Sequence, residues 1–269
     1  MLSNQFLFKW AKDNRKRLCK EFFWSRNVPS GQKVALFMAW SPGAGKTEFI
    51  KRLLSDNQES WYYVLDLDEI RWWMPGYNGR NAEKYTKWAI KILEMLFDEC
   101  VHYEYPFILD GTFTSTGTID RNIERLIRKN YEVDVFYIHL LPELAWLYTL
   151  CRWKEEWRLI PVNRFIHDYY VAPENVCLFA EKYPEKMKIF IVNRTYKNWE
   201  SPYEIFAFEN HMSIHNFLDK HAIINYTVWN RLSKCKYQCY KFISFIPYLW
   251  KKILLQILAK KEQWLSKKS

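Results

Sequence analysis

Short apolar runs alternate with amphipathic stretches along the first two thirds of this chain. The apolar runs are strand-like, whereas apolar residues at helical spacing between them predict helices. We expect strands at 33–40, 61–70, 106–113, 133–141 and 188–193, and helices at 1–28, 47–56, 82–102, 120–130 and 142–157. Strands that alternate with helices indicate an α/β domain whose mostly parallel sheet is covered by helices on both faces. Such sheets bind ligands at the carboxyl ends of their strands.

The same pattern divides the chain into three parts. We expect a helical N-terminal segment at 1–30, a core at 31–200 and a basic, mainly helical extension at 201–269. A chain of 269 residues suffices for one large α/β domain with an extension. Residues 241–264 are typical of a basic amphipathic helix, which we expect to cover the core rather than to lie on a membrane. No run of about 18 uncharged apolar residues occurs, so we expect no membrane span.

A phosphate-binding loop is indicated between the first expected strand and the helix that follows it. The stretch SPGAGKT occupies residues 41–47, and a strand, a glycine loop and a helix are the context in which backbone N–H groups cradle phosphates. Lys46 would reach the β and γ phosphates of a nucleotide, and Thr47 would hold Mg²⁺. The alternative is a glycine-rich turn that binds no ligand. The expected nucleotide contacts are Ser41, Pro42, Gly43, Ala44, Gly45, Lys46 and Thr47.

Acidic and hydroxyl side chains follow the next two expected strands. Asp66 and Asp68 stand two residues apart at the end of the second strand, where they would share a face of that strand. One of them is a candidate general base for an attacking hydroxyl, and the alternative is a pair of solvated acids that cap the next helix. Asp110 and Thr112 flank Gly111 at the end of the third strand and are candidates to bind substrate hydroxyls, with an ordinary turn as the alternative.

Basic residues exceed acidic ones, and the formal net charge is +10. A basic protein favours anionic partners such as nucleotides, nucleic acids or acidic membranes. Arg152 and Arg158 are candidates to clamp phosphates, although a solvated helix face is the usual place of such charges. Aromatic residues make up 19% of the chain but stand mostly at core-like spacings, so we expect no nucleic-acid partner. Six scattered cysteines without a disulfide framework indicate reduced thiols and a cytoplasmic location.

Taken together, these stretches resemble the zeta toxin family of P-loop kinases. The matching stretches follow the family's order between residues 33 and 193, and they are SPGAGKT, LDLDEIR with PGYNG behind it, FILDGTF, VFYIHLLPELAW and CRWKEEWRLIP. The resemblance implies the P-loop kinase fold. It also implies a transfer of phosphoryl from ATP or GTP, with Mg²⁺, to the sugar 3′-hydroxyl of UDP-N-acetylglucosamine.

The resemblance implies roles for single residues as well. Asp68 matches the catalytic base, and Asp110 and Thr112 match contacts to the sugar nucleotide. Thr114 stands where some members carry an arginine, so another small hydroxyl substrate stays an alternative. An antitoxin or other inhibitor protein is a candidate partner, and the N-terminal helix is its candidate docking site. The family's phosphate-handling residues match here at Lys46, Thr47, Arg152 and Arg158.

Glycine is scarce in this chain and tryptophan is abundant. There are 14 Trp but only 7 Gly, against the roughly 19 Gly that a usage of about 7% would give. Trp40 fills the opening glycine position of the phosphate-loop signature, Trp157 stands where many relatives have glycine, and Trp199 takes the glycine position of an Asn-Gly turn. We hypothesise that such tryptophans are glycines at UGA codons, which some bacterial codes read as glycine and other codes as tryptophan. If Trp40 is genuine, we expect strain in the loop and a catalytically impaired nucleotide-binding protein.

Overall fold

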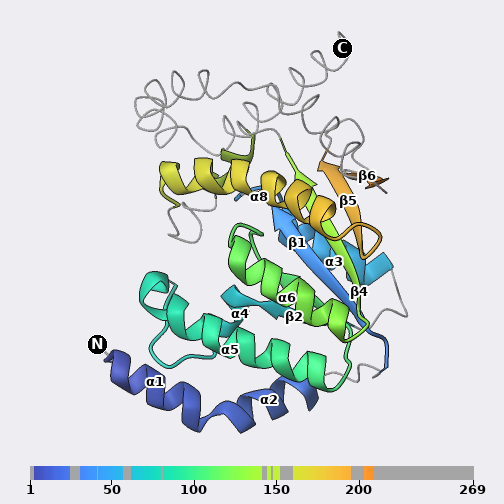
Figure 1. The fold of residues 1–269 in the computed structure, drawn as a ribbon. Helices are drawn as coiled ribbons and strands as arrows, with labels where there is room; N and C mark the ends of the chain where they lie inside the picture. Colours follow the sequence, from blue (N-terminus) through green and yellow to red (C-terminus); the bar gives the residue numbers. More distant parts are fainter. Residues whose placement is uncertain are drawn as a thin grey trace.

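The computed structural model describes residues 3–24, 31–40, 42–56, 62–79, 81–140, 144–146, 148–151, 160–194 and 203–208. Within these ranges one six-stranded sheet is flanked by helices (Figure 1). The strands are β1 (Val34–Trp40), β2 (Tyr63–Asp66), β3 (Phe107–Asp110), β4 (Glu132–His139), β5 (Met187–Arg194) and β6 (Tyr203–Phe208). The helices are α1 (Asn4–Asp13), α2 (Arg15–Trp24), α3 (Lys46–Asp56), α4 (Leu67–Trp72), α5 (Ala82–His102), α6 (Thr116–Arg128) and α8 (Val162–Lys182).

The sheet is mostly parallel, as the alternating pattern predicts. Its strand order is β2-β3-β1-β4-β5-β6. The first five strands in this order run parallel to their neighbours, and β6 pairs antiparallel with β5. The strand β1, which leads into the phosphate loop, therefore lies inside the sheet, and this explains why its sequence is an unbroken apolar run.

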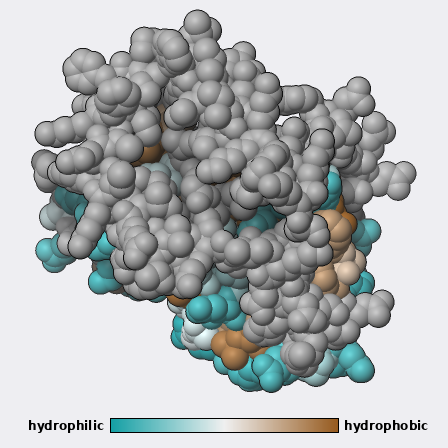
Figure 2. Space-filling model, turned by 90° about the horizontal axis from the view of Figure 1, so that it is seen from above, coloured by the Kyte–Doolittle hydropathy of each residue, from teal (hydrophilic) through white to brown (hydrophobic). Residues whose placement is uncertain are grey.

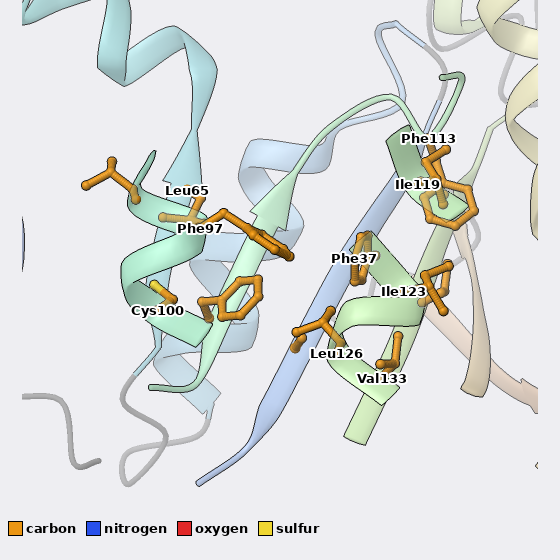
Figure 3. Packing of buried hydrophobic residues seen from close by; sticks show 14 of the residues in the cluster. Phe37, Leu65, Phe97, Cys100, Phe113, Ile119, Ile123, Leu126 and Val133 are labelled. Atoms are coloured by element: carbon orange, nitrogen blue, oxygen red, sulfur yellow. The ribbon is translucent and has the colours of Figure 1, made fainter. Parts of the chain in front are cut away.

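Helices cover both faces of the sheet. The side chains of β1 show this, since successive residues of a strand point to opposite faces. Phe37 packs into a core with residues of α5, α6 and α8, whereas Met38 packs into a second core with residues of α3. Figure 3 shows the first core, in which Ile123 and Leu126 of α6 lie beside Phe37. The expected α/β architecture with helices on both faces is thus confirmed.

The N-terminal segment forms two helices where the sequence pattern predicts one. Helix α1 ends at Asp13 and helix α2 begins at Arg15. Asn14 between them leaves the helical conformation (φ −95°, ψ 3°), and its side-chain amide donates to the carbonyl of Trp10. An asparagine side chain that bonds to the backbone competes with the helix, which accounts for the break. Both helices pack against α5.

The second strand is shorter than expected. It ends at Asp66, and α4 follows at once, so the expected strand at 61–70 is wrong beyond that residue. The side chain of Asp66 accepts from the backbone N–H of Asp68 at 2.7 Å. An aspartate at this position satisfies one of the free donors of a helix N-terminus, and the helix can therefore begin directly after the strand.

The sheet continues past the boundary that the pattern places at residue 200. Residues 203–208 form the edge strand β6, in a segment expected to be mainly helical. The expected helix at 241–264 lies outside the described residues, so the division of the chain into three segments stays a prediction.

The surface offers no membrane-crossing element in the part that the structure describes, since no helix there is both long and apolar enough. Where described residues are visible in Figure 2, the surface is mostly hydrophilic with small hydrophobic patches. The described cysteines are free thiols, as expected: Cys19, Cys100, Cys151 and Cys177.

Candidate active site

The carboxyl ends of three neighbouring strands meet at one edge of the sheet. Asp66 at the end of β2 lies in register with Asp110 at the end of β3, and Asp110 lies in register with Met38 of β1. The phosphate loop leaves β1 at this edge and enters α3 at Lys46. The parallel sheet therefore brings the predicted strand-end acids to the predicted loop.

Two glycines of the loop are required by its geometry. Gly43 (φ 85°) and Gly45 (φ 88°) lie in the left-handed region, which residues with a Cβ rarely adopt. A Cβ on Gly43 would collide with the carbonyl oxygen of Ala145, and a Cβ on Gly45 would collide with the guanidinium of Arg194. The loop can turn tightly against these two groups only because both positions are glycine. Ser41, the first predicted nucleotide contact, lies outside the described residues.

Lys46 and Asp110 form a buried ion pair. The Nζ of Lys46, at the start of α3, donates to Oδ2 of Asp110, and the two side chains are 8% and 3% exposed. Burial raises the pKa of Asp110 from its ordinary 3.8 to about 6; the ammonium of Lys46 limits the rise, and the carboxylate of Asp66 adds to it. Oδ1 of Asp110 is buried and has no hydrogen-bond partner among the described residues. The pair thus leaves one acceptor that the hydroxyl of a ligand could satisfy.

Asp68 lies in the first turn of α4 and not on the strand. The expectation that Asp66 and Asp68 share a face of one strand is therefore wrong, because Asp66 caps the helix that contains Asp68. The carboxylate of Asp68 is 36% exposed and accepts from Nη1 of Arg71, three residues later. Arg71 is buried, and its Nη2 donates to Oγ1 of Thr86 on α5 at 3.2 Å. Arg71 thus holds the carboxylate of Asp68 and links α4 to α5.

A first cavity of about 350 Å³ surrounds the phosphate loop. Its lining includes Gly43, Lys46 and Thr47 from the loop and Asp66 and Asp68 from the strand end and α4. The hydroxyl and carboxylate oxygens of these residues are the ligand type that Mg²⁺ prefers. Among the described residues, no three His, Cys, Asp or Glu side chains stand close enough to hold a metal by themselves. The donor set therefore fits a Mg²⁺ ion that takes its remaining ligands from water and phosphate.

A second cavity of about 560 Å³ lies beside the first. Asp110 at the end of β3 and Thr112 and Thr114 in the segment after it line this cavity, together with residues of α5 and α6. Asp110 lines the second cavity while its ion-pair partner Lys46 lines the first. The two cavities therefore adjoin at this ion pair.

Trp40 ends β1 in an extended conformation. It lies in register with Ile138 of β4, and its φ is not among the positive values of the described residues. The backbone strain expected from the loss of a glycine is therefore not found. The indole ring lies over Lys46, with 4.6 Å between Nζ and the ring centroid, and it lines the first cavity. Its Nε1 is buried without a partner among the described residues. What Trp40 brings to the site is the bulk of its ring.

Comparison with known proteins identifies the family of this chain. The family model described as Zeta toxin matches residues 22–201. The chain belongs to the zeta toxin family. One relative is the toxin PezT of Streptococcus pneumoniae serotype 4, which is 28% identical over 187 residues, 67% of this chain and 67% of that protein. The resemblance drawn from the sequence is confirmed.

Solved structures share the fold of this zeta toxin family member. A structure of the PezAT chromosomal toxin-antitoxin system of Streptococcus pneumoniae has a TM-score of 0.55 at 25% identity, over 72% of this chain and 79% of that chain. The AvrRxo1-ORF1:AvrRxo1-ORF2 structure with sulphate ions has a TM-score of 0.53 at 12% identity, over 75% of this chain and 65% of that chain. The same pair with ATP also gives 0.53 at 12% identity, over 75% and 64%. The expected P-loop kinase fold is thereby confirmed.

Some of the predicted site residues lie outside the described part of the chain. Besides Ser41, they are Arg152, Trp157, Arg158 and Trp199, and what we expect of them stays a prediction.

The structure adds two arginines that the sequence analysis missed. Arg194 ends β5, its Nη1 lies 3.5 Å from the carbonyl oxygen of Ala44, and its guanidinium lies 5.1 Å from the ring centroid of Tyr148. The rule that selected strand-end acids would have selected this strand-end arginine too. Arg71 ends the matching stretch LDLDEIR, but its contact with Asp68 follows from the helix and not from the strand that we expected.

Proposed function

We propose that this chain is a kinase that transfers the γ-phosphoryl group of ATP or GTP to a sugar hydroxyl, the 3′-hydroxyl of UDP-N-acetylglucosamine. Its membership of the zeta toxin family supports this reaction. The observation that carries the proposal is the Lys46–Asp110 ion pair, at which the loop cavity adjoins the larger second cavity. A nucleotide in the first cavity and an acceptor in the second would meet there, and catalysis of phosphoryl transfer rests chiefly on such positioning.

The phosphate loop would hold the nucleotide. Its N–H groups and the ammonium of Lys46 would bind the phosphates, and Thr47 would hold Mg²⁺, which neutralises charge on the transferring group when bound. A nucleotide phosphate would compete with Asp110 for Lys46. Because burial raises the pKa of Asp110 to about 6, this carboxyl group takes up a proton at a higher pH than an ordinary aspartate, and a protonated Asp110 would release the ammonium of Lys46 to the phosphate. Arg152 and Arg158 are proposed as further phosphate contacts.

The acceptor would bind in the second cavity. Asp68 is the proposed base that takes the proton of the attacking hydroxyl. Its position supports this role, because Leu67 lines the second cavity while the next residue, Asp68, lines the first. Oδ1 of Asp110 and the hydroxyl of Thr112 would bind the acceptor's own hydroxyl groups.

The test is the formation of a phosphorylated product by purified protein with Mg²⁺ and ATP or GTP, followed by mass spectrometry. UDP-N-acetylglucosamine, UDP-glucose and free N-acetylglucosamine are compared as acceptors. Asp68→Asn should lower turnover by about 10²- to 10⁴-fold while nucleotide affinity stays unchanged. Glu21→Gln, at an exposed carboxylate of α2, is the matched control. A phosphorylated product from another acceptor alone would refute the proposed substrate, and a protein that binds no nucleotide would refute the kinase.

Two features of the chain favour a second candidate. The ring of Trp40 lies over Lys46 within the loop cavity, which favours a nucleotide-binding protein with impaired turnover. Thr114 replaces an arginine of some relatives, which favours a P-loop kinase for another small hydroxyl substrate. Measured nucleotide binding without transfer to any of the acceptors would support the first of these readings.

We also propose an antitoxin as the protein partner. The support is family membership and similarity to a pneumococcal protein named as a toxin, together with a similar structure from a toxin-antitoxin system. Co-expression with the gene product encoded next to this one should yield a stable complex in size-exclusion chromatography, and separate elution of the two proteins would contradict the proposal.

A further inference from the structure

The segment between β3 and α6 contains an aromatic residue in a conformation that side chains rarely adopt. Phe113 has a φ of 58°, in the left-handed region, and its side chain is 4% exposed. Bulky residues are genuine outliers there and persist only when the surroundings hold them. The groups that hold Phe113 in this conformation therefore determine the shape of the segment between β3 and α6.

Helix α8 supplies most of the groups that hold Phe113. Nδ2 of Asn175 donates to the carbonyl oxygen of Phe113 at 3.0 Å in the protein interior, across 62 positions of sequence. Oδ1 of the same Asn175 accepts from Oγ1 of Thr116, the first residue of α6, at 3.1 Å. One buried amide thus ties both ends of the segment 113–116 to α8.

Aromatic packing fixes the ring of Phe113 from two sides. Its centroid lies 6.0 Å from that of Phe37 on β1 and 5.8 Å from that of Phe179 on α8, both in edge-to-face geometry. Figure 3 shows Phe113 and Phe37 in this core. Asn175 and Phe179 stand four residues apart on α8 and hence on one face of that helix. The same face of α8 therefore contacts both the backbone and the side chain of Phe113.

The consequence appears on either side of Phe113. Thr112 and Thr114 both line the second cavity, and their hydroxyl oxygens lie 2.8 Å apart in a hydrogen bond. In a regular strand, residues two apart share a face, but the strand has already ended at Asp110. Phe113 also lines this cavity, and its ring belongs to the buried core, so the left-handed turn at Phe113 lies between two threonine hydroxyls that meet at the cavity.

We propose that Asn175 is a positioning residue for the acceptor site, which holds Phe113 in its left-handed turn and so presents the hydroxyls of Thr112 and Thr114 to the acceptor. This inference rests on the proposed function in one respect, that the second cavity receives the acceptor. Asn175 itself is not among the residues that line either cavity. It acts on acceptor binding through the backbone of the segment 111–116.

The test compares variants that break the two hydrogen bonds of Asn175 one at a time. Asn175→Asp keeps the acceptor for Thr116 and loses the donor to Phe113, whereas Thr116→Val breaks only the other bond. Glu174→Gln, at an exposed neighbour on α8, is the control. If Asn175→Asp does not fold, Asn175→Ala, in which water can reach the carbonyl, takes its place.

Two measurements are made on each variant. Hydrogen exchange with mass spectrometry should show amides of residues 111–115 exchanging at least about tenfold faster in Asn175→Asp, with the peptides of β1 and α3 unchanged. Calorimetric titration with UDP-N-acetylglucosamine, and KM for that acceptor, should weaken by about 5- to 100-fold, because a buried carbonyl loses its donor. KM for ATP should stay within about twofold, a split that general loss of stability would not produce. Glu174→Gln should change acceptor affinity by less than about twofold, whereas Thr116→Val, which releases only the α6 end of the segment, should weaken acceptor binding less than Asn175→Asp does.

Each outcome bears on the inference. Unchanged exchange in residues 111–115 would overturn it, even if the protein is a kinase. Faster exchange with unchanged acceptor affinity would overturn it as well, because the segment would then not form the acceptor site. If the original chain transfers phosphoryl to no acceptor, the proposed function fails, while the exchange and binding measurements still decide whether Asn175 holds a ligand-binding segment.

Discussion

Replacing Trp40 tests whether the phosphate loop needs an opening glycine or only needs space. The backbone of Trp40 is extended, and its ring lies over the ammonium of Lys46. Since any residue can adopt an extended backbone, Trp40→Ala and Trp40→Gly should affect nucleotide binding equally. A requirement for glycine flexibility predicts instead that only Trp40→Gly gains affinity.

The size of the effect follows from the contacts of the ring. A cation–π contact is worth about 0.5–2 kcal/mol, so releasing Lys46 to a phosphate should tighten nucleotide binding about 2- to 30-fold. Stability should change in the other direction. Truncation of a fully buried tryptophan costs roughly 3–5 kcal/mol, and Trp40 is only half-buried, so we expect a loss of about 2 kcal/mol. Glycine inside a strand adds about 0.5–1 kcal/mol to that loss.

The assay is calorimetric titration with ATP and Mg²⁺, together with thermal denaturation. For a chain of this size the stability loss corresponds to a Tm lower by roughly 4–10 °C. Trp88→Ala is the control, because Trp88 is buried in the main core and lies in neither cavity lining; it should lower Tm without a gain in affinity. If neither Trp40 variant binds ATP more tightly than the original chain, the ring is not the obstacle that we describe. A gain confined to the glycine variant would show that the loop must leave its extended entry to bind nucleotide.

Two further predictions concern the same edge of the sheet. Gly43→Ala should weaken ATP binding about tenfold or more, since a left-handed residue with a Cβ costs about 1–2 kcal/mol before its collision with Ala145. The control is Gly117→Ala, whose Cβ would meet nothing within 4 Å and which should bind ATP as the original chain does. Equal ATP affinities of the two variants in calorimetric titration would contradict the loop geometry. Asp110→Asn should remove a pH dependence of stability. Because the folded pKa of Asp110 is raised, the stability that its protonation confers is complete below pH 3.8 and is lost as the pH rises through about 6. The unfolding free energy of the original chain relative to the variant should therefore fall by about 3 kcal/mol over that window, and a constant difference in urea titrations would refute it.

The parts of the site that could be predicted from the sequence depend on local signals and on one rule of topology. The stretch from Gly43 to Thr47 carries its own turn chemistry, and β1 is apolar along its length because both of its faces are buried. The meeting of Asp66, Asp110 and Lys46 then needs no knowledge of side-chain packing. It follows from parallel strands whose carboxyl ends share an edge.

The parts that could not be predicted depend on single hydrogen bonds that override a pattern. Asp66 alternates properly for a strand, yet its side chain caps a helix and ends the strand there. Asn14 breaks a helix in the same manner through its bond to Trp10. We expected no element where α8 lies, and Pro173 inside this helix is normally a sign of interruption. The left-handed turn at Phe113 depends on a partner 62 positions away, which no local pattern can reveal.

The described tryptophans differ in how far their rings are exposed, and this difference indicates which of them are glycine under the codon hypothesis. Trp24 and Trp72 are 78% and 63% exposed, which is unusual for so large a ring, and each is the last residue of its helix, a region where glycine is common. Trp88 and Trp146 are buried instead and pack edge-on or tilted against another aromatic ring. If UGA codons explain the tryptophan excess, they should occur at 24, 40 and 72, with UGG at 88 and 146. Peptide masses from the native host would then give glycine at the first three positions and tryptophan at the other two, whereas UGG codons at 24, 40 and 72 would refute the hypothesis. Trp40 and Trp72 both line the loop cavity, so glycine at these positions would widen the space in which we propose that the nucleotide binds.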